Sequence, residues 1–199
     1  MIERPILFSG PMVRAILEGR KSQTRRVLRV PDHPAVADWV LDSEYRAAAR
    51  APSESVAEQY VSTFPYGRVP CRYGRPGDRL WVRETWRQGN TGVLYRADDI
   101  CPSQQHWRPS IFLKRAACRL VLEVTAVRVE RLQDISEADA MAEGVEAVPV
   151  RAFEHAHTPP PREAVPAYRA LWDSLNAKRA PWSRNPWVWV VEFRKRGAA

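Results

Sequence analysis

The chain has 199 residues, and 45% of them are hydrophobic, which is enough to bury one sizeable core. Its formal net charge of +8 comes from 31 lysines and arginines against 23 aspartates and glutamates. That balance favours a phosphate-bearing partner, although an arginine-rich solvated surface would give the same count. No apolar run approaches the ~20 residues of a membrane span. With three cysteines, no CxxC pair and no signal-like start, we expect a cytoplasmic protein without a membrane partner.

A strand and a helix are predicted at the start of the chain. Residues 5–9 form a short apolar run, and Ser9 with Pro11 is typical of a helix start. Gly19 stands where a helix end favours a left-handed residue. Apolar residues at helical spacing predict the inner face of this helix: Met12, Val13, Ile16 and Leu17.

Two further strands are predicted at 24–30 and 79–86, because their side chains alternate. The weak periodicity of residues 31–70 between them predicts an insertion. The alternation places Arg26 on the inner face of the first of these strands and Glu84 on the inner face of the second. A buried carboxylate needs a partner, so we predict an ion pair between Arg26 and Glu84.

The second half of the chain has predicted strands at 93–97, about 118–130 and 187–195, helices at 136–144 and 163–177, and a second insertion at 146–162. Alternation in the long strand predicts an inner face of Leu120, Leu122, Val124 and Ala126. The last helix is predicted to bury a stripe of Tyr168, Leu171, Trp172 and Leu175. Strands with irregular connections favour one α+β domain over residues 1–199, built as a small, mostly antiparallel β-barrel with two or three packed helices.

Known cofactor motifs are missing from the sequence. It has no Gly-rich dinucleotide motif, no phosphate loop with its lysine and no G-x-S-x-G. His155 and His157 stand two residues apart in a proline-rich loop, but a metal site would need a third ligand at fixed spacing. We therefore expect neither a metal nor another cofactor.

The basic turn after the first helix carries the chemistry of interest. Lys21 is one of only four lysines, and Thr24 follows three residues later. A threonine hydroxyl becomes a nucleophile when a base accepts its proton. Lysine can be that base if burial and neighbouring positive charges, here Arg20, Arg25 and Arg26, lower its pKa. An ordinary basic turn with a β-branched strand starter is the alternative.

The pattern Gly19-x-Lys21-x-x-Thr24-x-Arg26 resembles the G-x-K-x-x-T-x-R signature of the ASCH domain family, whose fold is a PUA-like β-barrel. The segments "PGDRLWVRETW", "ERLQDISEADAMAEG" and "PWVWVVEF" follow the family's order and are most similar to phage- and prophage-type members. Some bacterial members remove the acetyl group from N4-acetylcytidine. The resemblance thus implies an amidohydrolase of a modified nucleoside or base, with Lys21, Thr24 and Glu143 as catalytic residues.

In this implied reaction, Lys21 takes the proton of Thr24, Thr24 attacks the acetyl carbonyl, and Glu143 donates a proton to the departing nitrogen. Backbone amides of residues 20–24 or Arg26 are candidates for stabilising the oxyanion. The predicted substrate-binding residues are Gly19, Arg26, Arg83 and Glu84.

Two alternatives use the same basic turn. The family also includes RNA binders and members with nuclease activity, so the chain is alternatively an RNA-binding module without catalysis or a ribonuclease. The role of Glu143 is also open, because a glutamate before a helix-ending glycine is ordinarily solvated and has no catalytic role. Glu84 is a competing carboxylate that pairs with Arg26 or holds the substrate. The oligomeric state is left open.

Overall fold

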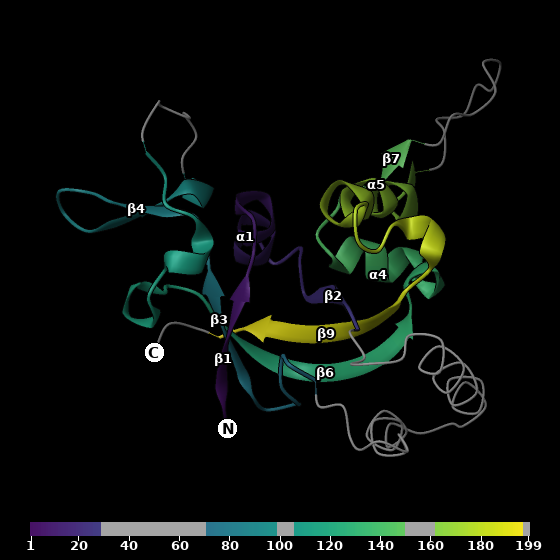
Figure 1. Ribbon diagram of the computed structural model, residues 1–199, viewed down its shortest axis with the longest axis horizontal. Helices are drawn as coiled ribbons and strands as arrows, with labels where there is room; N and C mark the ends of the chain where they lie inside the picture. The colour runs from purple at the N-terminus through teal and green to yellow at the C-terminus, as the bar shows by residue number, and fades with distance from the viewer. Residues whose placement is uncertain (29–70, 99–105, 150–161, 197–199) are drawn as a thin grey trace.

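A computed structural model describes residues 1–28, 71–98, 106–149 and 162–196 of the chain (Figure 1). Its main sheet has five strands in the order β1-β3-β6-β9-β2. Their bounds are β1 (Glu3–Leu7), β2 (Gln23–Val27), β3 (Arg79–Arg83), β6 (Val121–Arg131) and β9 (Trp187–Lys195).

The remaining elements are α-helices, short strand pairs and single 3-10 turns. The helices are α1 (Gly10–Leu17), α4 (Glu137–Ala142) and α5 (Val165–Asn176). Two strand pairs join β4 (Trp86–Gln88) to β5 (Val93–Tyr95) and β7 (Val148–Pro149) to β8 (Arg162–Glu163). The 3-10 turns are η1 (Arg96–Asp98), η2 (Ser110–Phe112), η3 (Arg115–Ala117), η4 (Leu132–Asp134) and η5 (Trp182–Arg184).

The sheet is mixed. β1 and β3 pair in parallel, while β3–β6, β6–β9 and β9–β2 are antiparallel. The α+β class is therefore confirmed. The predicted barrel is not, because within the described ranges the main sheet is open and has β1 and β2 at its edges.

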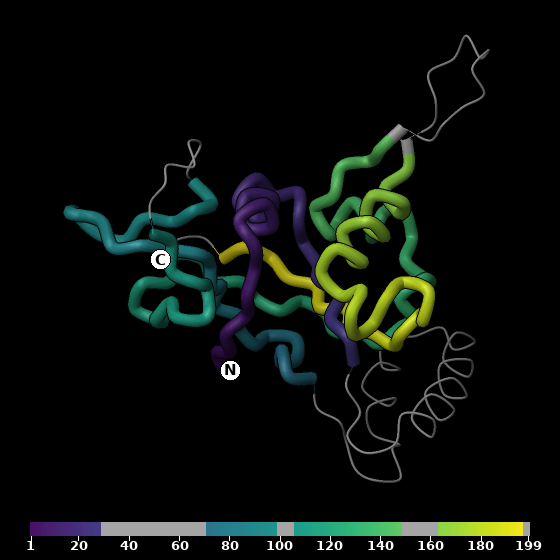
Figure 2. The backbone as a smooth tube through the Cα atoms, turned by 45° about the horizontal axis from the view of Figure 1, so that its top comes forward, coloured from purple at the N-terminus to yellow at the C-terminus, as the bar shows by residue number. Residues whose placement is uncertain are grey.

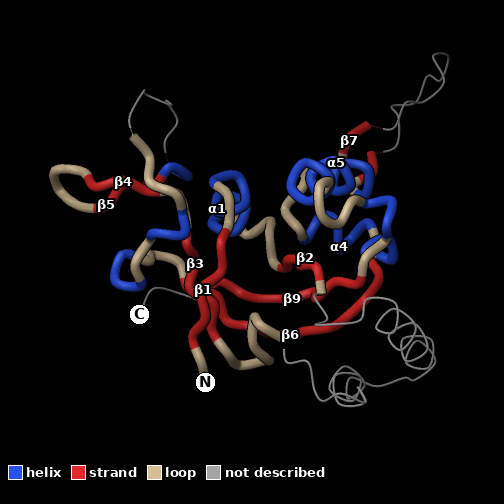
Figure 3. The backbone as a smooth tube through the Cα atoms, in the orientation of Figure 1, coloured by secondary structure: helices blue, strands red, loops and turns tan. Residues whose placement is uncertain are grey.

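Alternate residues of β9 pack into two separate cores, which lie on opposite faces of the strand. One core, shared with β1, β3 and α1, contains Trp189, Val191 and Phe193. The other, shared with α5, contains Val188 and Val190. Figure 1 shows α1 near β1 and β3, and α4 grouped with α5 toward the other end of β9. The turned view of Figure 2 and the colouring of Figure 3 show β2 running between these helix groups.

A β-bulge in β6 changes which side chains face each core. The pairing of β6 with β9 shifts between Val124 and Ala126. A bulge inserts one unpaired residue and so reverses the alternation beyond it. Val127 and Val129 accordingly pack against the first core. The prediction that Ala126 continues the inner face is wrong for this reason.

Several local predictions are confirmed. The predicted strand at 187–195 matches β9. The Ser136 hydroxyl accepts a hydrogen bond from the Asp139 amide at 3.1 Å, which caps α4 as the sequence predicts. Pro166 lies in the first turn of α5, and Gly19 adopts a left-handed conformation with φ of 78°.

Other local predictions are wrong. Leu17 and Leu175 are 36% and 60% exposed, because each lies in the last turn of its helix, beyond the residues that the helix buries. The predicted strand at 79–86 is interrupted after Arg83, and Trp86 begins β4. The helix start at Ser9 is confirmed, because Ser9 occupies the N-cap position of α1 and Pro11 lies in its first turn, but the Ser9 side chain makes no capping hydrogen bond.

The two predicted insertions are described only in part. The first, 31–70, lies outside the described residues. Of the second, 146–162, the ends are described and pair as β7 and β8, while 150–161 lie outside, together with His155 and His157. Among the helices that the structure describes, none has the length and apolar character needed to cross a membrane.

Asp78 ties the start of the chain to the turn before β3. Its carboxylate accepts hydrogen bonds from the Ile2 amide at 2.8 Å, the Arg4 guanidinium at 2.9 Å and the Arg75 amide at 3.3 Å. Burial alone would raise the pKa of Asp78, but these donors outweigh it and hold the pKa below its ordinary value. The carboxylate thus stabilises the parallel pairing of β1 with β3 in its charged form.

Replacing Asp78 with Asn should lower the free energy of unfolding by about 2 kcal/mol at neutral pH, because the charged acceptor is lost. The stabilisation is fully present above the unfolded pKa of about 3.9 and is lost as pH falls through the lower folded pKa. Urea denaturation at several pH values measures the difference, which should shrink below about pH 4. The exposed Asp134→Asn is the matched control. An equal loss in both variants would contradict the prediction.

Candidate active site

The backbone brings Lys21 beside Glu143. The chain leaves α1 through Gly19, and the Lys21 amide donates to the Ala15 carbonyl at 3.0 Å. Lys21 then pairs with Glu143 as an isolated antiparallel bridge. The next amide, of Ser22, donates to the Ala142 carbonyl at 2.9 Å. The end of α4 is thereby fixed against the segment that enters β2.

The side chains of Lys21 and Glu143 form a buried ion pair. Lys21 Nζ donates to Glu143 Oε2 at 2.7 Å and to the Glu143 carbonyl at 2.8 Å. The side chains are 0% and 4% exposed. Glu143 is therefore not the solvated helix-end glutamate of the alternative interpretation. Two members of the predicted catalytic set, 122 residues apart in sequence, are in direct contact.

Arg25 extends this pair into a larger charged cluster that the sequence analysis missed. Its fully buried guanidinium lies 3.4 Å from Glu143 Oε1 and 3.0 Å from Asp139 Oδ2, and it also binds Glu130. Arg128 contacts both Asp139 and Glu130. The β-bulge in β6 places Arg128 and Glu130 on this side of the sheet, opposite Val127 and Val129. The only sign of this cluster in the sequence is the alternation of Arg128 and Glu130 with Val127 and Val129. Which face of the sheet Arg128 and Glu130 occupy depends on that bulge.

Burial is the main cause that lowers the pKa of Lys21 from its ordinary value. The Glu143 carboxylate acts in the opposite direction, while the positive charges of Arg26 and Arg25 lower the pKa further. Burial and the nearby Glu143 charge also raise the pKa of the Tyr168 hydroxyl well above its ordinary value. The site therefore favours the neutral amine of Lys21 over its ammonium, and it keeps the Tyr168 hydroxyl protonated and neutral.

Thr24 is buried in β2, opposite Val191 of β9. It shares a strand face with Arg26, whose Cζ lies 5.4 Å from the centre of the Phe8 ring. Lys21 Nζ lies 5.6 Å from the same ring. The Thr24 hydroxyl makes no hydrogen bond within the part of the chain that the structure describes, and both hydrogen bonds of Lys21 Nζ go to Glu143. The structure thus assembles Lys21 with Glu143 and leaves the Thr24 hydroxyl unengaged.

The predicted pair between Arg26 and Glu84 is wrong. Glu84, which is 1% exposed, accepts two hydrogen bonds of 2.9 Å from Arg119. Arg26 donates instead to the Leu7 carbonyl at 2.8 Å. Arg119 comes from the segment before β6. The alternation of side chains predicts that Glu84 is buried, but it cannot predict which of the two arginines binds it. Glu84 therefore has a structural partner.

Arg26 and Arg83 both keep an unused hydrogen-bond donor. Arg83 lies beside Leu7 in the β1–β3 register, and its guanidinium stacks on Trp81 at 4.6 Å. The Nε atoms of Arg26 and Arg83 are buried without an acceptor among the described residues. Buried donors without acceptors are costly, so an oxygen-bearing ligand here would relieve that cost. Gly19, the fourth predicted substrate-binding residue, is exposed, and a side chain there would meet nothing within 4 Å.

A cavity of about 650 Å³ adjoins the same segment on its other side. It is lined by Arg20 and Ser22, the sequence neighbours of Lys21, and by residues that follow α4, including Val145 and Glu146. In an extended segment these side chains point away from that of Lys21. Across the described ranges, no group of three or more His, Cys, Asp or Glu side chains is arranged to hold a metal ion.

Comparison with protein-family models, with curated proteins and with solved structures finds no match to this chain. The site is therefore defined by its geometry alone.

Gly144 controls how closely Glu143 and Lys21 approach. Its φ is 85°, and an added Cβ would lie 2.9 Å from both Ala15 Cβ and Lys21 Cβ. Gly144→Ala should therefore lower the free energy of unfolding by about 3 kcal/mol, from backbone strain plus overpacking.

The matched control for this prediction is Gly19→Ala. Gly19 has a similar φ of 78° but open space around the added Cβ. It should lose only about 1 kcal/mol in the same urea denaturation experiment. Equal losses for the two variants would show that the approach of Gly144 to Lys21 is not tight.

Proposed function

We propose that the chain hydrolyses an N-acylated nucleobase or nucleoside of the N4-acetylcytidine kind, using Lys21, Thr24 and Glu143. The observation that carries the proposal is the buried contact of 2.7 Å between Lys21 Nζ and Glu143 Oε2. We further propose that the open sheet belongs to a PUA-like barrel of the ASCH type. The signature from Gly19 to Arg26 and the position of Glu143 beside Lys21 support that assignment.

The pair can supply both a base and an acid from one shared proton. When the proton lies on Lys21, the residues form an ammonium and a carboxylate. When it moves along the hydrogen bond to Glu143, they become a neutral amine and a carboxylic acid. Burial favours the neutral amine of Lys21 over its ammonium.

In the proposed reaction, the neutral Lys21 amine accepts the Thr24 proton while Thr24 Oγ bonds to the acyl carbonyl carbon. The C–N bond then breaks, and the departing nitrogen takes the proton of the Glu143 carboxylic acid. Water then attacks the carbonyl carbon of the Thr24 ester and gives one proton to the Glu143 carboxylate. The bond between that carbon and Thr24 Oγ breaks, Lys21 returns its proton to Thr24 Oγ, and the carboxylic acid leaves. Lys21 must turn toward Thr24 for the first step, and catalytic hydrogen bonds commonly tighten only when substrate binds.

Arg26 is the proposed binding donor beside Lys21, and Arg83, whose side chain stacks on Trp81 on the sheet face opposite Leu80 and Val82, is a second donor on the other face. Their unused Nε groups suit a carbonyl or phosphate oxygen of the substrate. The Phe8 ring, which both Lys21 and Arg26 approach, is the apolar wall beside Arg26.

A second candidate function is RNA recognition without catalysis. The same two unused arginine donors favour it, since a phosphate oxygen would satisfy them as well as a carbonyl would. A protein of this kind would bind RNA with a steep loss of affinity as salt rises and would leave the acyl group in place.

The purified protein incubated with N4-acetylcytidine should release cytidine and acetate, which chromatography measures. Lys21→Met and Glu143→Gln should each reduce kcat/KM by at least about 100-fold, because each removes one site of the shared proton. Thr24→Ala should abolish turnover, whereas Thr24→Ser should retain part of it through its hydroxyl. The wild-type kcat/KM should fall as the pH is lowered through the pKa of Lys21, because a protonated Lys21 cannot accept the Thr24 proton.

Lys178→Met, at an exposed position of the described chain, is the matched control and should leave the rate unchanged. A folded wild-type protein without turnover would overturn the hydrolase in favour of RNA recognition. Retained turnover in Lys21→Met would overturn the role of Lys21.

A further inference from the structure

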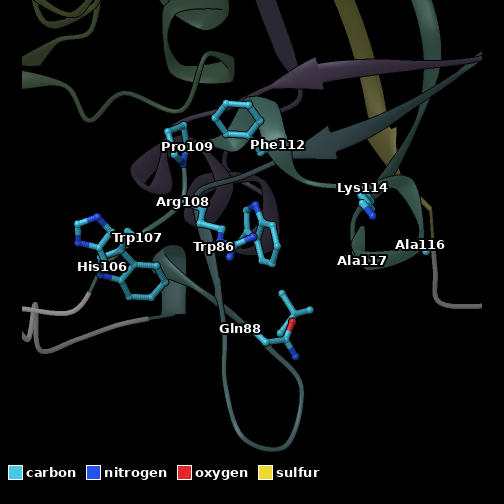
Figure 4. Close-up of a pocket in the computed structure, with 11 residues that line it drawn as sticks. Trp86, Gln88, His106, Trp107, Arg108, Pro109, Phe112, Lys114, Ala116 and Ala117 are labelled. Atoms are coloured by element: carbon cyan, nitrogen blue, oxygen red, sulfur yellow. The ribbon is translucent and has the colours of Figure 1, made fainter.

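A second cavity, of about 870 Å³, has neither Lys21 nor Glu143 in its lining, and Figure 4 shows the residues that form it. The β4–β5 hairpin and the segment 106–117 form it, and its principal lining side chains are Trp86, His106, Trp107, Arg108, Phe112 and Lys114. Figures 1 and 2 both show the β4–β5 hairpin on the far side of α1 from α4 and α5. The proposed hydrolase uses none of these side chains.

The cavity is held together by backbone pairing and by stacked cations. Trp86 and Arg108 exchange backbone hydrogen bonds of 3.2 and 2.8 Å. The guanidinium of Arg108 lies 5.3 Å from the Trp86 ring, and that of Arg87 lies 5.4 Å from the Trp107 ring. Such cation–π contacts orient both partners. The two indoles are thus fixed in place before any ligand arrives.

The charge of the lining is one-sided. His106, Arg108 and Lys114 contribute cationic or titratable nitrogen, and none of the described residues that line the cavity is a carboxylate. The nearby Glu84 and Asp98 are both bound by Arg119. The electrostatic field of the lining therefore favours an anionic ligand.

Two further features favour a ligand that has flat rings as well as negative charge. Phe112 is 61% exposed and lines the cavity. Trp86 Nε1 is buried without an acceptor within the described part of the chain. Exposed aromatic rings beside cations bind stacked bases together with phosphates, and an unused indole donor suits a base carbonyl. An acidic peptide would use the cations but would leave the rings and the indole donor without a role.

We infer that this cavity binds single-stranded nucleic acid, with bases stacked on Phe112 and Trp107 and phosphates beside Arg108 and Lys114. The inference does not depend on the proposed hydrolase, because the two sites share no residue. A chain that acts on an acylated base within RNA would hold the neighbouring nucleotides here.

Fluorescence anisotropy with a labelled single-stranded oligouridylate of about 12 nucleotides tests this inference on the full chain. Phe112→Ala should weaken binding about tenfold, because one stacked base loses its platform. Lys114→Ala should weaken binding. It should also reduce the slope of log Kd against log salt by about one, because one phosphate contact is lost. The matched exposed Lys178→Ala should bind as the wild type does.

Three outcomes would overturn the inference. If Phe112→Ala and Trp107→Leu both bind with wild-type affinity, these rings do not stack the bases. Equal binding of a base-paired duplex, or of a polyglutamate peptide, would show a site for anions in general. Loss of binding in Lys21→Met, with Phe112→Ala unaffected, would move RNA binding to the first site. Hydrolysis of free N4-acetylcytidine should be unchanged in Phe112→Ala, so the two proposals can fail separately.

Discussion

The ion pair between Lys21 and Glu143 is the contact on which this site depends. An ammonium that is fully removed from water is tolerated only beside an opposite charge or after losing its proton. Glu143 meets that need from the end of α4, and Gly144 allows the close approach by having no Cβ. The pair therefore joins the segment after α1 to the segment after α4, and β2 enters the sheet between two independent cores.

Burial also suits the pair to the proposed proton transfer, because it lowers the pKa of Lys21. Arg25 and Arg26 add positive charge around Lys21, which favours the neutral amine. Arg25 also binds Glu143, Asp139 and Glu130, so it holds the charged cluster together as well. Arg26 and Arg83 add donors that nothing in the described chain uses. With the tryptophan-lined cavity at the β4–β5 hairpin, the protein has two separate sites for which we propose nucleobase and phosphate ligands.

Local patterns predicted much of the fold, and long-range geometry was where the predictions failed. The alternation of "WVWVVEFRK" gave β9 its bounds, and Ser136 with Gly144 gave the limits of α4, because these signals act within a few residues. The bulge near Val124 leaves no clear mark in the sequence, yet it sets the facing of Arg128 and Glu130. Likewise, parity made Glu84 a buried carboxylate but could not show that Arg119, and not Arg26, would reach it. The contact of Lys21 with Glu143 was expected only from the family resemblance, since no local rule links residues so far apart.

The most direct test of this account is the pKa of Lys21, measured by NMR from the pH dependence of its side-chain Cε resonance. The chain has only four lysines, and Lys114, Lys178 and Lys195 are exposed. Lys21 should titrate below the ordinary value of about 10.4, and Arg26→Gln should move its pKa upward. A Lys21 that titrates at or above about 10.4 would mean a permanent ammonium bound to Glu143 and would contradict its role as a base.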